Sequence, residues 1–295
     1  MTASAEEIKA CCAAAYASPL ARWLLGSSFH PGGAALTGRL IRALAVDASC
    51  TVADVACGPG ESAFQLAREM GCRVVGIDLS AESIDAARRA AEDAGLADSV
   101  RFLVGDAEAL PLEAASVDGV LCECSFCTLP NKAAAAAELA RVLKPGGRLA
   151  LSDVTADRGR LPPALRTLDG WIACLADARP LEELLALVRG AGLVVDVVER
   201  HDEALAELLA RVDGRLRVAR LALVQGEDPA LVNRGFELLE AARESLVRGI
   251  LGYAVIVARR PPLRLEATDE RVGASNLLCA ARDACGTVPG WYEPG

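Results

Sequence analysis

The chain has 295 residues, and its 31 Lys and Arg residues are outnumbered by 40 Asp and Glu residues, which gives a formal charge of −9. This length fits one large α/β domain with additions, or one domain plus a small second unit. The acidic balance argues against a nucleic acid as partner, because phosphate binding needs clustered Lys and Arg. The apolar runs are far shorter than the roughly 20 residues of a membrane-spanning helix, so we expect no membrane partner.

The start of the chain, Met1–Lys9, is acidic and rich in alanine, and it lacks the basic and apolar regions of a signal peptide. We therefore expect a cytoplasmic location. The 11 cysteines are then unusual, because a reducing cytoplasm does not favour structural disulfides.

Short apolar, β-branched runs alternate with helical segments from Thr51 onward, which is typical of βαβ units on a parallel sheet. In chain order, the expected strands are residues 51–56, 73–78, 101–105, 117–121, 148–153, 193–199 and 251–258. The expected helices are residues 61–70, 80–94, 131–143, 181–191, 203–223 and 229–248. We divide the chain into an N-terminal helical cap over residues 1–50, a central domain over residues 51–260 with a helical insertion at about 203–248, and a cysteine-containing tail over residues 261–295.

A glycine-rich turn, Gly58-Pro59-Gly60, follows the first expected strand and precedes a helix. Alone it is a weak signal, because such turns also occur for steric reasons. The next strand ends at Asp78, whose carboxylate can accept hydrogen bonds from both hydroxyls of a ribose, and the third is followed by Asp106. These residues meet at the carboxyl edge of the sheet, where open α/β folds bind ligands.

On these motifs the sequence resembles the class I S-adenosylmethionine-dependent methyltransferases, from about Thr51 to Asp153 and more weakly to Ala258. The resemblance implies an α/β fold with a Rossmann-like, seven-stranded, mostly parallel sheet, and S-adenosyl-L-methionine as cofactor. The cofactor-binding residues that it implies are Asp54, Ala56, Gly58, Gly60, Asp78, Leu79, Asp106, Ala107 and Cys122. The family's usual first glycine is Ala56 here. An NAD-binding domain is the alternative, but the third glycine of its pyrophosphate fingerprint is absent near residues 61–62.

The cysteines allow three interpretations. Any single cysteine is most often a small buried hydrophobic residue. Structural zinc at Cys124 and Cys127 needs two further ligands, and the two histidines of the chain, His30 and His201, lack the usual finger spacing. The third interpretation is a thiol-bound methyl acceptor.

That third interpretation rests on a second resemblance. Asn131-Lys132 and residues 149–158 resemble the arsenite methyltransferases, and this register aligns two cysteines of that family with cysteines here. The family also carries a cysteine pair ahead of the methyltransferase domain. The thiols implied to be catalytic, and to hold trivalent arsenic as substrate, are Cys11 or Cys12, Cys124 and Cys174. Thiolates are the soft ligands that such an acceptor prefers.

The candidate acceptors differ in whether they need a general base. A metalloid lone pair attacks the activated sulfonium methyl without losing a proton, whereas a carbon, oxygen or amine acceptor usually needs a general base. Of the two histidines, we expect His201 at the surface, and His30 either near the site or capping a helix that begins near Ala34. The leading prediction is an arsenite methyltransferase-like enzyme, with a thiol reductant as a further partner. The alternatives are a methyltransferase for a small organic molecule, with structural cysteines, and a non-catalytic metalloid or thiol sensor.

Overall fold

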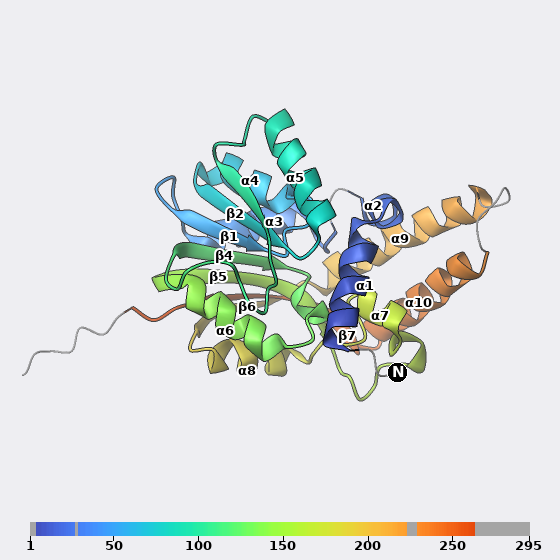
Figure 1. Ribbon diagram of the computed structural model, residues 1–295. Coiled ribbons are helices and arrows are strands. Elements are labelled where there is room, and N and C mark those ends of the chain that lie inside the picture. Colours follow the sequence, from blue (N-terminus) through green and yellow to red (C-terminus); the bar gives the residue numbers. More distant parts are fainter. Residues whose placement is uncertain (1–3, 27–28, 223–228, 263–295) are drawn as a thin grey trace, which may run out of the picture. The chain divides into compact units, whose positions relative to one another are not determined.

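The computed structural model describes residues 4–26, 29–222 and 229–262 (Figure 1). The expected tail from residue 263 onward, with Cys279 and Cys285, lies outside the described residues. Among the helices of the described part, none is both long and apolar enough to cross a membrane.

Seven strands in the described residues form one sheet in the order β3-β2-β1-β4-β5-β7-β6. Their bounds are β1 (Thr51–Val55), β2 (Arg73–Asp78), β3 (Val100–Val104), β4 (Val117–Glu123), β5 (Leu143–Ala156), β6 (Val194–Arg200) and β7 (Leu251–Arg259). Neighbouring strands are parallel, except that β7 is antiparallel to both β5 and β6. The predicted fold class is confirmed.

Helices cover both faces of the sheet (Figure 1). One face carries α3 (Gly33–Leu44), α4 (Glu61–Met70) and α5 (Ala81–Asp93), and the other carries α6 (Lys132–Val142) and α8 (Leu181–Gly190). In α5, Ile84, Ala87 and Ala91 are buried, as their helical spacing predicts. The two faces bury separate hydrophobic clusters, so the sheet is covered on both sides, as parallel sheets usually are.

A further set of helices adds to this framework. They are α1 (Ala5–Ala17), α2 (Pro19–Leu25), α7 (Leu168–Ile172), α9 (Asp202–Ala222) and α10 (Pro229–Val247). Helix α1 contacts α2 and α7, while α9 and α10 contact each other and β7. The insertion therefore packs against the sheet. The 3₁₀ turns η1 (Phe126–Thr128) and η2 (Pro163–Leu165) were not predicted, and neither was α7.

One predicted boundary is wrong. The sequence prediction began the fifth strand at Arg148, after a helix stop at Pro145-Gly146-Gly147, whereas β5 begins at Leu143 and includes this stop. The reason is tertiary, because the backbone N–H of Gly146 donates to the carbonyl of Arg260, and the carbonyl of Gly147 accepts from the N–H of Arg260. Pairing with the residue that follows β7 thus extends the strand through a turn-like sequence.

Gly170 in α7 sits where a side chain does not fit, since an added Cβ would lie 2.2 Å from the carbonyl oxygen of Leu165. We expect Gly170→Ala to lower the free energy of unfolding by about 1–3 kcal/mol, the usual cost of overpacking. Gly214→Ala in α9 is the matched control, because its Cβ meets open space, and alanine there should stabilise the helix by about 0.5–1 kcal/mol. Urea unfolding followed by circular dichroism measures both variants. An unchanged midpoint for Gly170→Ala contradicts the prediction.

Candidate active site

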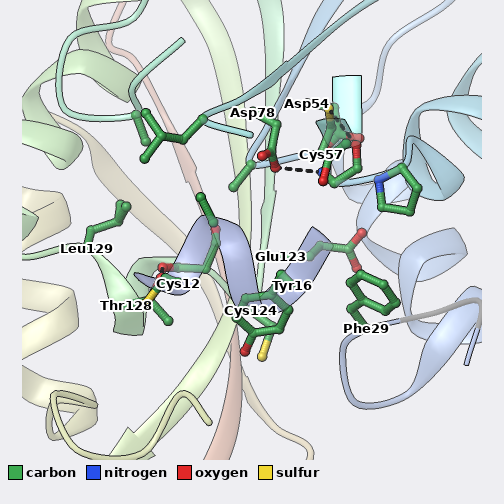
Figure 2. Close-up of a pocket in the computed structure, with 18 of the residues that line it drawn as sticks. Cys12, Tyr16, Phe29, Asp54, Cys57, Asp78, Glu123, Cys124, Thr128 and Leu129 are labelled. Atoms are coloured by element: carbon green, nitrogen blue, oxygen red, sulfur yellow. Dashed lines mark hydrogen bonds between the residues drawn. The ribbon is translucent and has the colours of Figure 1, made fainter. Parts of the chain in front are cut away.

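A pocket lies at the carboxyl ends of β1, β2 and β4, with α1 forming part of its wall (Figure 2). Parallel strands bring the loops that follow them to one edge of the sheet, so residues distant in sequence share this pocket. The described wall residues include Lys9, Cys12, Tyr16, Phe29, His30, Asp54, Ala56, Gly58, Ser62, Asp78, Leu79, Asp106, Ala107, Glu123, Cys124 and Leu129. Of the predicted cofactor residues, all but Gly60 and Cys122 are in this set.

Gly60 and Cys122 lie outside the described pocket wall. Gly60 is the N-cap of α4 with φ +91°, and an added Cβ would lie 2.7 Å from the ring of Phe102, so this position needs glycine for steric reasons. The Cys122 side chain is fully buried, with its Sγ 3.2 Å from the hydroxyl of Ser125.

The two acidic residues at the ends of β1 and β2 differ in their hydrogen bonds. One oxygen of Asp78 accepts from the backbone N–H of Gly58 and the other from that of Ser80, each at 2.8 Å, so the glycine turn and the β2 end are tied together. Asp54 is buried, and its Oδ2 has no hydrogen-bond partner among the described residues. A buried polar atom without a partner is costly. It marks a place where a ligand can donate a hydrogen bond.

The two aspartates at this edge of the sheet have raised pKa values. Burial, together with the charges of Glu123 and Asp78, raises the pKa of Asp54 well above its usual range. Burial also raises the pKa of Asp78. A cationic ligand group bound here would relieve this repulsion.

Three thiols converge at the other end of the pocket. The Sγ atoms of Cys124, Cys127 and Cys174 all lie within 4.8 Å of one another. Cys124 follows β4, Cys127 lies in η1, and Cys174 follows α7, so three separate elements contribute. Only Cys124 of the three is among the described residues of the pocket wall. We call Cys124, Cys127 and Cys174 the thiol cluster.

Two cysteines of the thiol cluster have left-handed backbone conformations. Cys124 has φ 48° and Cys174 has φ 65°. Such conformations cost a non-glycine residue about 1–3 kcal/mol and persist only where the surrounding structure enforces them. Here the N–H of Cys124 donates to the carbonyl of Ser152 at 2.7 Å, and that of Cys174 donates to the carbonyl of Trp171 at 2.9 Å. Backbone strain of this kind is typical of functional sites.

The thiols of the cluster shift one another's pKa values. Hydrogen bonds with Cys124 and Cys127 hold the pKa of Cys174 well below its usual range, whereas burial raises the pKa of Cys127 well above it. The Tyr16 hydroxyl donates to the carbonyl of Ile172 and lies 3.1 Å from the Sγ of Cys174. These contacts favour the anionic form of Cys174.

The predicted N-terminal thiols lie on α1. Cys12 is buried in the pocket wall, and burial together with the neighbouring Cys174 raises its pKa to about 12. Cys11 is half-buried and is not among the described wall residues. Neither is in the thiol cluster, whose third member is Cys127. Sequence analysis considered Cys127 only for zinc, although its spacing from Cys124 already placed two thiols close together.

The two histidines lie in different parts of the structure, only one of them in the described pocket wall. His30 is buried in the pocket wall, and its Nδ1 lies 3.6 Å from an oxygen of Glu123. It does not cap α3, whose N-cap is Gly32. Glu123, which sequence analysis missed, also accepts from the Ser62 hydroxyl at 2.7 Å. His201 instead lies 3.1 Å from Glu199, outside the described pocket wall.

Known proteins show where this chain belongs. A methyltransferase domain family matches residues 53–151. The chain is 37% identical over 61% of its length to methyltransferase GfsG of Streptomyces halstedii, covering 66% of that protein. It is 31% identical over 77% of its length to 27-O-demethylrifamycin SV methyltransferase of Amycolatopsis mediterranei, covering 83%. An arsenite methyltransferase of Halobacterium salinarum is 32% identical over 52% of this chain, with 40% of that protein covered.

A solved structure has the same fold. It is a Haemonchus contortus phosphoethanolamine N-methyltransferase with S-adenosylhomocysteine, which aligns with a TM-score of 0.74 at 18% identity over 88% of this chain and 61% of that one. The chain belongs to the class I S-adenosylmethionine-dependent methyltransferases, and S-adenosylmethionine is its cofactor.

The pocket fits this cofactor. S-adenosylmethionine carries a cationic amino group and a ribose with two hydroxyls, both of which donate hydrogen bonds. The unpartnered oxygen of Asp54 and the carboxylate of Asp78 offer acceptors for such groups at the edge of the sheet.

Asp78→Asn tests the proposed ribose contact. We expect S-adenosylhomocysteine to bind about 10- to 100-fold more weakly, because hydrogen bonds to a charged acceptor are the strong ones. Isothermal titration calorimetry measures the change, and Asp118→Asn, at a carboxylate remote from the pocket wall, is the control. Unaltered affinity in Asp78→Asn rules out the contact.

Proposed function

We propose that this enzyme transfers the methyl group of S-adenosylmethionine to trivalent arsenic bound by Cys124, Cys127 and Cys174. The observation that supports the proposal is the convergence of three sulfur atoms within 4.8 Å beside the cofactor pocket. Trivalent arsenic takes three soft thiolate ligands. Cys127 thus replaces the N-terminal cysteine in the ligand set that the sequence predicted.

The surrounding residues prepare this reaction. S-adenosylmethionine supplies a methyl group that is already activated as a sulfonium. Cys124, as the pocket-wall member of the thiol cluster, brings the acceptor to the cofactor side, so the two reactants are held close together. Helix α1 covers this region with Cys12 and Tyr16, which limits the access of water (Figure 2). The arsenic lone pair is the nucleophile, so no general base is required.

We place the protein in the reducing cytoplasm. The nine cysteines of the described residues are all free thiols. Three adjacent thiols oxidise readily to a disulfide where no reductant is present. A thiol reductant is therefore proposed as a partner that keeps the thiol cluster reduced.

Arsenite methylation provides the direct test. Protein, S-adenosylmethionine, arsenite and a thiol are incubated, and methylated arsenic and S-adenosylhomocysteine are measured. We expect Cys127→Ser and Cys174→Ser to slow methylation roughly 10²- to 10⁴-fold, because each removes one of three linked ligands. Cys50→Ser, at a half-buried cysteine outside the pocket wall, should keep full activity. Wild-type rates in both cluster variants would refute the proposal, and cofactor binding without any turnover favours the sensor alternative.

A second candidate is methylation of a hydroxyl group on a small organic molecule. The buried pair of His30 and Glu123 in the pocket wall supports it, because a histidine held by a carboxylate is a suitable general base. One relative, the 27-O-demethylrifamycin SV methyltransferase, carries a name that fits this chemistry. On this hypothesis the thiol cluster is structural.

His30→Gln separates the two functions. Loss of a general base should slow methylation of a hydroxyl acceptor roughly 10²- to 10⁴-fold. Methylation of thiol-bound arsenic should change little, because its lone pair carries no proton. Parallel assays with arsenite and with a panel of phenols and alcohols measure both rates. A large loss on arsenite contradicts the arsenic mechanism described above.

A further inference from the structure

A buried ion pair connects the two segments that carry the thiol cluster. The Nζ of Lys132 lies 2.6 Å from Oδ2 of Asp177, and both side chains are 4% exposed. Lys132 begins α6, five residues after Cys127, and Asp177 follows Cys174 by three residues. The pair therefore links the turn that follows β4 to the loop that follows α7.

The lysine uses all of its hydrogen-bonding capacity at this place. Besides Asp177, its ammonium donates to the carbonyl of Cys127 at 3.0 Å and to that of Leu129 at 2.9 Å. An ammonium has three donors, and all three are satisfied. One of them holds Cys127 in η1 and another holds Leu129, the residue after η1, so the charge pair and the backbone of Cys127 are joined through one group.

Stability alone does not explain why this ion pair is buried. Desolvating two charges offsets most of their attraction, and an apolar pair of similar size is often as stable. The carboxylate of Asp177 also lies near Arg158 and Arg179, at 3.4 and 3.1 Å. What Lys132 adds is a connection from this carboxylate to the segment of Cys124 and Cys127.

The Lys132–Asp177 pair lies close to two residues with strained backbone conformations. Cys124 and Cys174 both have positive φ angles, and their segments meet only through tertiary contacts. A neutral hydrogen bond also joins these segments, from the indole N–H of Trp171 to the carbonyl of Thr128 at 2.9 Å. Cys124 and Cys127, by contrast, are neighbours within one turn.

We infer that Lys132 and Asp177 are positioning residues that hold Cys174 against Cys124 and Cys127, so that the site selects three-coordinate over two-coordinate arsenic. This inference rests on the proposed function. The ion pair does not touch the acceptor. It helps to keep the third sulfur in place, because Cys174 lies on a separate segment, whereas Cys124 and Cys127 lie within one turn.

Two arsenicals distinguish the coordination states. Arsenite requires three thiols, whereas phenylarsine oxide requires two. Affinities are measured by calorimetry on the full-length protein, and the number of thiols protected from alkylation is counted by mass spectrometry. We expect Lys132→Met to weaken arsenite binding about 10- to 100-fold, as is usual when a residue that orients ligands is lost. Phenylarsine oxide and S-adenosylhomocysteine should bind within about twofold of wild type, because the backbone N–H groups of Cys124 and Cys127 keep their hydrogen bonds to Ser152 and Asp153.

The control is Lys144→Met, which breaks a Lys–Asp pair with Asp118 away from the thiol cluster and should leave both arsenicals unaffected. If Lys132→Met no longer binds S-adenosylhomocysteine, Lys132→Met/Asp177→Leu is tested in its place, since it leaves no carboxylate without its lysine. Failure of this double variant to bind the cofactor overturns the inference, because the pair then serves the whole fold. Equal loss of both arsenicals, or wild-type arsenite binding, also overturns it. If wild-type protein protects fewer than three thiols with arsenite, the proposed function itself fails.

Discussion

The parallel pairing of β1 with both β2 and β4 is the constraint on which the rest of the site depends. Three strands that run side by side in one direction must release their following loops at the same edge. The glycine turn after β1, Asp78 at the end of β2 and Cys124 after β4 therefore surround one pocket. The proposed cofactor and acceptor residues meet because these strands are parallel neighbours, although the residues are far apart in the chain.

This edge also concentrates negative charge. Asp54, Asp78 and Glu123 all contribute carboxyl groups to the pocket wall. Mutual repulsion and burial raise the pKa of Asp54. A cationic cofactor reduces this repulsion, so the electrostatics of the pocket favour a sulfonium-bearing ligand over an anionic one.

Helix α1 connects the two ends of the site. The ammonium of Lys9 lies 2.7 Å from Asp106, at the loop that follows β3, while Tyr16 lies 3.1 Å from Cys174. One helix is thus anchored at the cofactor end by charge and at the acceptor end by a hydroxyl group. Placement of α1 is coupled in this way to both halves of the pocket.

The sequence by itself determined the seven strands and most of the helices between them, and it named seven candidate cofactor residues that line the pocket. Those features are local: β-branched runs, helical spacing and the turn Gly58-Pro59-Gly60 each depend on neighbours in the chain. It also placed Cys124 near Cys127, since the two are one turn apart.

Tertiary structure alone decided that Cys127 is the thiol that joins Cys124 and Cys174, and that His30 lies beside Glu123. The sequence prediction chose Cys11 or Cys12 as partners of Cys124 and Cys174 because a family pattern contains an N-terminal pair, but α1 places Cys12 in the pocket wall, outside the thiol cluster. Contacts between loops that are distant in sequence depend on packing and on buried pairs such as Lys132 and Asp177, which no local pattern specifies.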